Sequence, residues 1–266
     1  MNRTVTGLAT YPGRPHSLHL RDLPAPEAGF GEVVVRPRRV GICGTDREII
    51  EATFGQAPAG EDDLVLGHEV LGIVESVGDG VTTISPGDLV GSTVRRPDGC
   101  PACRAGQPDM CLWLNYSERG ILRAHGFMAE RFVERVEHLV PIPTSLEPVG
   151  VFLEPLSVVE KAYRQAVLIQ RRITSWRPAA SIVLGAGPIG LLQTLLLREQ
   201  GAEVWTLARS APPNPASRIV EAAGAHYIST RETSLGELAP SLPNIDLIIE
   251  ATGVSDVIAE SMAALG

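Results

Sequence analysis

Long apolar runs and a leader-like start are both missing from this sequence of 266 residues. No stretch approaches the ~18 uninterrupted apolar residues that a membrane-spanning helix needs. The first residues, MNRTVTGLATYPG, lack the apolar centre of a secretory signal. We therefore expect no membrane partner and a cytoplasmic location.

Positive charge is also scarce. Lys and Arg number 23 against 31 Asp and Glu, which gives a formal net charge of −8. The arginines at 36–39, 95–96 and 171–172 form short, scattered groups. Binding to a phosphate backbone uses a basic patch or stripe, so no nucleic-acid partner is expected. A hydrophobic content of 44 % excludes disorder as the main state and indicates a globular chain of one large or two ordinary domains.

Cysteine is rare, and its placement matters more than its number. Of the four cysteines, three lie between residues 100 and 111. A disulfide framework belongs to small secreted domains, which this chain does not resemble in size. Clustered cysteines in a reducing compartment indicate a metal site instead.

The first part of the chain, up to about residue 143, consists of short β-forming runs separated by Gly, Pro and Asp. Such runs include EVVVRPRRVGIC, LVLGHEVLGIVESVG, GDLVGSTV and MAERFVERVEHLVPIP. A high density of strand and turn signals predicts a partly closed antiparallel barrel or a sandwich.

Helical spacing replaces this pattern from Ser145 to about Arg172 and predicts a connecting helix. One face of that helix is expected to carry Leu156, Val159, Ala162, Tyr163 and Ala166. We therefore divide the chain into residues 1–172, a first domain with its connecting helix, and 173–266, a second domain.

The second domain alternates strand and helix, the pattern of a parallel sheet covered on both faces. The expected strands are SIVLG, AEVWTLA, AHYIS and IDLIIEATG, with helices at LLQTLLLREQG and SRIVEAAG. A doubly wound sheet has six strands, so this one is expected to be incomplete at its C-terminal end. An exposed edge strand promotes association, so we expect poor solubility or impaired activity unless a further segment is supplied.

A glycine-rich loop joins the first predicted strand to the first predicted helix. Its glycines permit a tight turn, close approach of a pyrophosphate and close packing of the helix, whose N-terminus attracts phosphate. Proline is tolerated in the first helical turn. The loop therefore predicts dinucleotide binding by Gly185, Gly187, Pro188, Ile189 and Gly190.

The second predicted strand ends in Ala208, Arg209 and Ser210, where NAD-specific loops usually carry an acidic residue. Without a carboxylate to repel a 2′-phosphate, and with Arg209 and Ser210 available to bind it, NADP is favoured over NAD. The alternative is that Arg209 is an ordinary surface residue and that both cofactors are used.

Possible zinc ligands gather in two short motifs, GICGTD and LGHEVLG. Cys43 and His68 suit zinc as ligands. Glu69 or Glu154 either supplies a third ligand or lies just outside the coordination sphere. Taken singly, the cysteine and the histidine are more often ordinary buried residues. The hydroxyl of Thr45 could relay a proton, and Asp46 either supports a ligand or caps a turn.

These motifs, with SVG, PGDLV and GAGPIG, resemble the zinc-dependent medium-chain dehydrogenase/reductase family over essentially the whole chain. The runs VRRPDGCPACRAGQPDMC, YSERGI, HGFMAE and VFLEPLSVVEKA are similar to its glucose 1-dehydrogenase branch. The resemblance implies a GroES-like β-barrel followed by a Rossmann sheet, and oxidation of an aldose at C1. It also assigns Cys43, His68 and Glu69 to the catalytic zinc, Glu154 to a position near zinc and sugar, and Glu118 to a sugar hydroxyl. For the last two, a solvated or capping role is the alternative.

The cysteine-rich lobe matches three of the four positions of that family's structural zinc site: Cys100, Cys103 and Cys111. The fourth position is Pro97, which cannot bind metal, and Asp98 could complete the site instead. The alternatives are a three-cysteine site completed by water, a lobe with free thiols, and a disulfide between Cys100 and Cys103.

Together these features predict a zinc-dependent enzyme that oxidises an aldose, D-glucose first, with NADP or NAD as hydride acceptor. Zinc lowers the pKa of the C1 hydroxyl, and Thr45 or a glutamate carries the proton away. One alternative is a dehydrogenase of another polyol or a secondary alcohol. Another is an impaired chain that only binds cofactor or zinc. A homo-oligomer, dimer or tetramer, is expected if the C-terminal strands are present.

Overall fold

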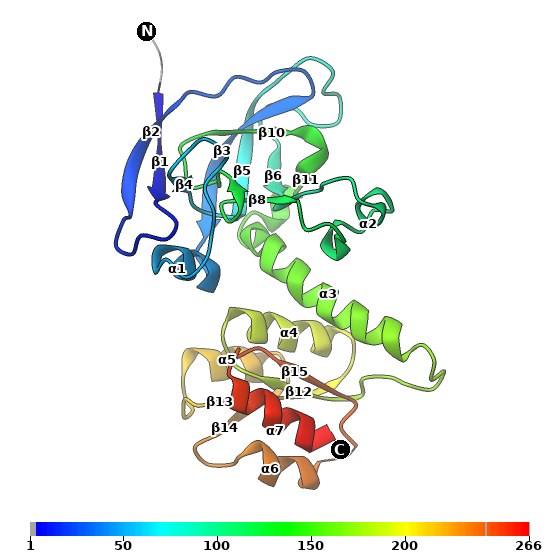
Figure 1. Ribbon diagram of the computed structural model, residues 1–266. Coiled ribbons are helices and arrows are strands. Elements are labelled where there is room, and N and C mark those ends of the chain that lie inside the picture. Colours follow the sequence, from blue (N-terminus) through cyan, green and yellow to red (C-terminus); the bar gives the residue numbers. More distant parts are fainter. Residues whose placement is uncertain (1–3, 243, 266) are drawn as a thin grey trace. The chain divides into compact units, whose positions relative to one another are not determined.

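The computed structural model describes residues 4–242 and 244–265 (Figure 1). The chain divides into two compact units, Met1–Glu154 and Pro155–Gly266. Within the described ranges, no helix is both long and apolar enough to cross a membrane.

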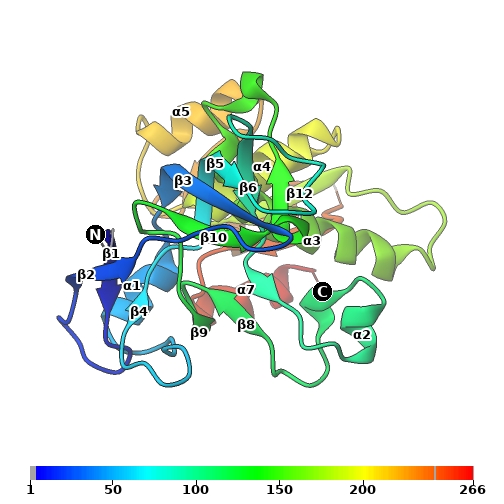
Figure 2. The same cartoon turned by 90° about the horizontal axis from the view of Figure 1, so that it is seen from above.

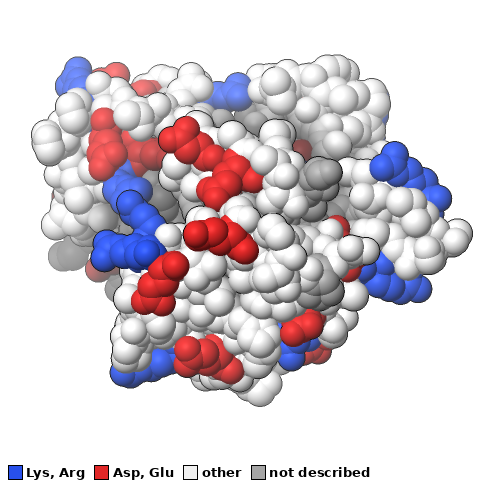
Figure 3. All heavy atoms as spheres, turned by 90° about the horizontal axis from the view of Figure 1, so that it is seen from below, with Lys and Arg blue, Asp and Glu red and all other residues white. Residues whose placement is uncertain are grey.

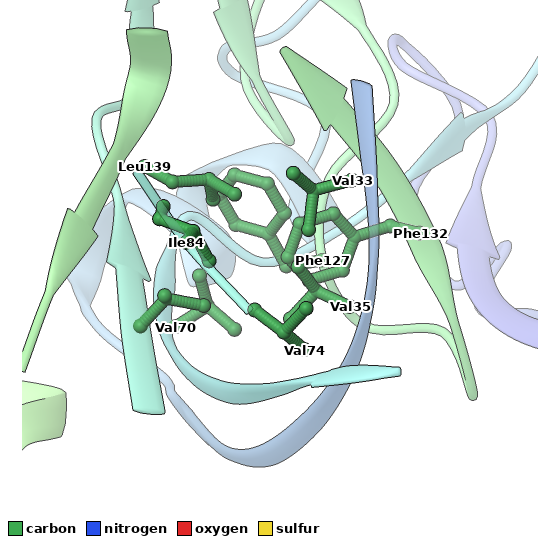
Figure 4. Close-up of a cluster of buried hydrophobic side chains, with 9 residues drawn as sticks. Val33, Val35, Val70, Val74, Ile84, Phe127, Phe132 and Leu139 are labelled. Atoms are coloured by element: carbon green, nitrogen blue, oxygen red, sulfur yellow. The ribbon is translucent and has the colours of Figure 1, made fainter. Parts of the chain in front are cut away.

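A five-stranded antiparallel sheet forms the centre of the first unit. Its order is β10 (Phe132–Arg135), β3 (Glu32–Gly41), β5 (Glu69–Val77), β6 (Leu89–Ser92) and β11 (Leu139–Pro141). The sheet curls into a half-barrel, which confirms the predicted partly closed barrel. Val33 and Val35 on β3 and Val70 and Val74 on β5 point toward one another and toward Phe127 in its core (Figure 4).

Two small sheets and short helices complete this unit. One sheet has the order β2 (His19–Pro24), β1 (Thr4–Thr10), β4 (Leu64–Val65), and the other β7 (Arg95–Arg96), β8 (Ser117–Arg119), β9 (Arg123–Ala124). The α-helices are α1 (Gly44–Ile50) and α2 (Pro101–Arg104). The 3-10 turns are η1 (Pro108–Met110), η2 (Val136–His138), η3 (Thr144–Leu146) and η4 (Gly150–Phe152).

The predicted connecting helix exists but begins later than expected. Helix α3 spans Leu153–Gln170, and η3 and η4 occupy the stretch from residue 144 to 152. Pro148 explains the late start, because proline has no N–H to donate and disfavours helical backbone in the residue before it. Of the residues expected to share one face of this helix, Val159 is buried and Leu156 is 40 % exposed.

The second unit contains a parallel sheet of four strands, each at a predicted position. Its order is β14 (His226–Ser229), β13 (Glu203–Ala208), β12 (Ala180–Leu184) and β15 (Leu247–Glu250). This is the 3-2-1-4 order of a doubly wound dinucleotide fold. The helices are α4 (Pro188–Glu199), α5 (Pro215–Ala222), α6 (Leu235–Leu238) and α7 (Ser255–Leu265), with a 3-10 turn, η5 (Ala239–Ser241).

Both faces of this sheet are covered (Figure 2). On β12, Val183 packs on one face with Leu197 of α4, and its neighbour Ile182 packs on the other with Leu235 of α6. Strands buried on both faces are continuously apolar, which is why these segments are recognisable in the sequence.

Charged side chains are unevenly spread over the face of the protein drawn in Figure 3. Asp and Glu gather in several groups near its middle, and Lys and Arg form separate small groups toward its margins. Among the described residues on this face, Lys and Arg form no continuous basic track of the kind that binds a phosphate backbone.

Candidate functional site

Cys43 is positioned as the N-cap of α1, directly after β3 ends. Its Sγ accepts a hydrogen bond from the N–H of Thr45 at 3.3 Å, and its own N–H donates to Asp46 Oδ2 at 2.9 Å. This reciprocal arrangement is a capping box. Helix α1 was not expected from the sequence, although an acidic residue three positions after the cap is a signal for it.

Glu69 is the first residue of β5 and His68 directly precedes it, and both are buried, with 8 % and 3 % exposure. Glu69 is opposite Gly41 of β3 in the ladder. A Cβ on Gly41 would lie 2.0 Å from Glu69 Oε2. Only glycine at this position leaves space for the carboxylate next to Cys43.

The predicted ligands converge on His68. Its Nε2 lies 3.2 Å from Cys43 Sγ. One ligand atom each from Cys43, Asp46 and His68 lie within 4.8 Å of one another, and the same holds for His68, Glu69 and Glu154. The structure thus brings together residues from α1, β5 and the first turn of α3.

Asp46 faces the other ring nitrogen of His68. Its Oδ1 lies 3.6 Å from His68 Nδ1, and neither buried atom has a hydrogen-bond partner within the described part of the chain. A histidine that binds metal through one nitrogen usually directs the other to a carboxylate. The sulfur, nitrogen and carboxylate donors therefore fit a zinc ion.

The electrostatics of the site also suit a cation. Burial lowers the pKa of His68, but Asp46 and Cys43 outweigh it and raise that pKa to about 10. Burial raises the pKa of Glu69 and of Glu154, and nearby carboxylates raise both further. Several acidic groups held together away from water are compensated by a bound divalent ion.

Glu118 lies on β8 opposite Arg95 of β7, and the two form an ion pair with Arg95 Nη2 2.7 Å from Glu118 Oε1. The charge of Glu118 contributes to the raised pKa of Glu154. Gly120, which follows β8, packs so closely on Gly67 that a Cβ would lie 2.3 Å from the Gly67 carbonyl oxygen. This contact fixes the β8 turn against the residue that precedes His68.

The cysteine-rich lobe forms a second cluster. One ligand atom each from Asp98, Cys100, Cys103 and Cys111 lie within 4.8 Å of one another. The Cys111 thiol donates to Asp98 Oδ2 at 3.0 Å, and all four cysteines of the chain are free. Hydrogen bonds, the Cys111 thiol first, hold the pKa of Asp98 well below its usual range.

The glycine loop adopts the expected strand-turn-helix form. Gly185 has a φ of 106°, which favours glycine, and a Cβ on Gly190 would lie 1.9 Å from the Gly185 carbonyl oxygen. Gly187 caps α4 with nothing within 4 Å of its Cβ position, and Pro188 is the first helical residue. Ile189 follows and is 36 % exposed.

Arg209 and Ser210 follow β13 and are exposed. The Ser210 carbonyl accepts a hydrogen bond from the Tyr227 hydroxyl at 2.8 Å. The Arg209 side chain and the Ser210 hydroxyl make no hydrogen bond within the described residues, which leaves both available to a ligand.

Comparison with known proteins adds independent findings. The family described as "Alcohol dehydrogenase GroES-like domain" matches residues 29–144, and "Glucose dehydrogenase C-terminus" matches 147–266. Glucose 1-dehydrogenase of Methanocella arvoryzae is 49 % identical over 251 residues, covering 94 % of this chain and 70 % of the relative. Glucose 1-dehydrogenase 1 of Caldivirga maquilingensis is 42 % identical over 261 residues, covering 98 % and 72 %.

A solved structure shares both the fold and the sequence similarity. Haloferax mediterranei glucose dehydrogenase in complex with NADP, Zn and gluconolactone matches with a TM-score of 0.88 and 37 % identity, covering 98 % of this chain and 74 % of that chain. These similarities extend through both units of the chain. The chain therefore belongs to the glucose 1-dehydrogenase branch of the zinc-dependent medium-chain dehydrogenase/reductase family.

Proposed function

We propose that this chain oxidises an aldose, D-glucose first, at C1 to the lactone and transfers the hydride to NADP. The observation that carries the proposal is the convergence of Cys43, Glu69 and Glu154 on His68. It occurs in a chain whose relatives are named glucose 1-dehydrogenases. A related structure holds NADP, Zn and gluconolactone.

In this proposal Cys43, His68, Glu69 and Glu154 hold the catalytic zinc. When bound, zinc supplies a positive charge that favours loss of a hydroxyl proton near neutral pH. Asp46 keeps the His68 ring oriented by facing its Nδ1.

The protein residues then bind and deprotonate the sugar. Glu118 accepts a hydrogen bond from one sugar hydroxyl, and Thr45 relays the C1 hydroxyl proton outward. Glu154, whose carboxylate lies beside His68 and Glu69, accepts the proton, since a carboxylate is a common general base. Loss of that proton and of the C1 hydrogen, as hydride to the nicotinamide, turns the C1–O bond into the carbonyl of the lactone.

The residues proposed to bind the cofactor belong to the second unit. Gly185, Gly187 and Gly190, with Pro188 and Ile189 at the start of α4, cradle the pyrophosphate. Arg209 and Ser210 bind the 2′-phosphate of NADP. An arginine and a hydroxyl suit a phosphate, and no carboxylate stands between 208 and 210 to repel it.

Further assignments complete the proposal. Residues 1–172 form the zinc-binding catalytic domain with its connecting helix, and 173–266 the cofactor-binding domain. Asp98, Cys100, Cys103 and Cys111 hold a second, structural zinc. The chain acts in the cytoplasm, and as a homo-oligomer, a dimer or tetramer, if the C-terminal strands are present.

The test is NADPH formation by the purified, zinc-loaded chain with D-glucose, other aldoses, polyols and secondary alcohols, each repeated with NAD. The proposal expects the highest kcat/KM with an aldose and NADP. A preference for a polyol or a secondary alcohol would assign the same machinery to another substrate. Absence of turnover with every substrate would reject the enzymatic function.

A further inference from the structure

Arg95 lies beside the proposed sugar site and makes contacts on three sides. Its Nε and Nη2 both donate to Glu118 Oε1, at 3.0 and 2.7 Å. Its Nη1 donates to the Pro108 carbonyl oxygen at 3.1 Å, and its guanidinium lies over the Tyr116 ring, 3.9 Å from the centroid. Because all three guanidinium nitrogens donate hydrogen bonds, the Arg95 side chain has one preferred orientation.

This arrangement leaves one carboxylate oxygen of Glu118 unused. Both guanidinium donors meet Oε1, and no hydrogen bond to Oε2 occurs within the described ranges. The Glu118 side chain is only 15 % exposed, so Oε2 competes with little bulk water. A carboxylate fixed through one oxygen can offer the other to a hydroxyl at low entropic cost.

We propose that Arg95 is a positioning residue that fixes the Glu118 carboxylate and leaves Oε2 directed at a sugar hydroxyl. The inference rests on the proposed function, since it requires a sugar at this site. Arg95 itself contacts no substrate. It acts through Glu118, and Pro108 and Tyr116 keep it in place.

A double-mutant cycle tests this role, with KM and kcat for D-glucose measured in the full zinc-loaded chain. The variants are Arg95→Ala, Glu118→Gln and the two combined. Arg95→Ala is expected to raise KM about tenfold, the size of one charge-assisted hydrogen bond, and to leave kcat within about threefold. In the Glu118→Gln background the same change should raise KM no further.

Two further variants guard against a purely structural explanation. Arg95→Lys keeps the positive charge but loses the planar guanidinium group with its several N–H donors. Its KM should therefore fall between those of the wild type and Arg95→Ala. Arg36→Ala breaks another partly exposed ion pair of the same unit, Arg36 Nε to Glu75 Oε1 at 3.0 Å, and should leave KM unchanged. Discrimination against a deoxyglucose that lacks the bound hydroxyl should weaken in Arg95→Ala but not in Arg36→Ala.

The possible results separate this inference from the proposed function. If the wild type oxidises glucose but Arg95→Ala keeps its KM, or if the two substitutions raise KM additively, the positioning role is rejected and the proposed function stands. If the wild type oxidises no sugar, the proposed function fails and the inference fails with it. If Arg95→Ala does not fold, an unchanged KM in Arg95→Lys with unchanged discrimination would likewise overturn the role.

Discussion

The two clusters of possible zinc ligands differ in how the chain supports them. The cluster around His68 is placed by regular elements: a helix N-cap, the start of a central strand and the first turn of a long helix. The lobe cluster is held by a loop with one short helix and one 3-10 turn. The residues just after it, Leu112, Trp113 and Leu114, are 67 %, 58 % and 66 % exposed.

Their charges differ as well. In the first cluster a histidine is supported by Asp46, and the carboxylates of Glu69 and Glu154 have raised pKa values. In the lobe, burial and Asp98 raise the pKa of Cys111, whereas two backbone N–H groups, acting against burial, lower that of Cys100. We therefore propose a reactive site in the first case and a structural site that holds the loop in the second.

The largest expected difference is in activity. His68→Ala removes the shared ligand of the first cluster and should lower kcat/KM for sugar oxidation by at least about 10³-fold, since metal stabilisation is worth several kcal/mol. NADP binding, measured by fluorescence titration, should be unchanged. Cys111→Ser in the lobe should leave kcat within about threefold well below its Tm. Equal losses in both variants would remove the distinction between the clusters.

The second expected effect is a loss of stability when the lobe cluster is broken. Cys111→Ser breaks the lobe cluster and should cost about 3 kcal/mol, or a fall in Tm of about 10 °C by calorimetry of the zinc-loaded protein. Met110→Ala, which changes an exposed neighbour, is the matched control and should stay within about 1 °C. An unchanged Tm in Cys111→Ser would mean that the lobe is held by packing alone.

Asp46 and Asp98 allow a finer comparison, because asparagine preserves the shape of each. Asp46→Asn still accepts the Cys43 N–H but loses the charge facing His68, and should weaken zinc binding at the catalytic cluster about 10- to 100-fold. Asp98→Asn should weaken binding only in the lobe. Competition with a chelator that resolves the two zinc ions tests both. Loss of the same ion in both variants would contradict the assignment.

The smallest expected effect concerns the pH dependence of the Tm of the metal-free chain. Because the pKa of His68 is raised to about 10 from 6.5, its protonation stabilises the fold fully below pH 6.5. That stability is lost as the pH rises toward 10, so the Tm should fall by several degrees. His68→Gln should abolish this slope. A Tm that rises over the same interval would contradict the pairing of His68 with Asp46.

The sequence predicted the strands of the parallel sheet well, for a physical reason. Runs such as SIVLG are buried on both faces, so their apolar character alone identifies them. His68 and Cys43 stood out because their glycine-rich surroundings are unusual for core residues. Gly41, which leaves room for Glu69, explains part of that pattern.

Other features could not be predicted because they depend on contacts between distant segments. Asp46 combines the two roles that the sequence left as alternatives, since it caps Cys43 through one oxygen and faces His68 through the other. The ion pair of Arg95 with Glu118 requires the register of β7 and β8. The late start of α3 depends on a proline whose effect the helical spacing of its neighbours obscured.

The most direct test of the account is the fate of the hydrogen on C1. D-glucose carrying deuterium at C1 should be incubated with NADP and the zinc-loaded chain, and the NADPH analysed by mass spectrometry beside His68→Ala. Direct hydride transfer at a zinc site held by His68 predicts one deuterium in the nicotinamide ring for the wild type and no turnover for the variant. Unlabelled NADPH from the wild type, or labelled NADPH at an undiminished rate from His68→Ala, would contradict it.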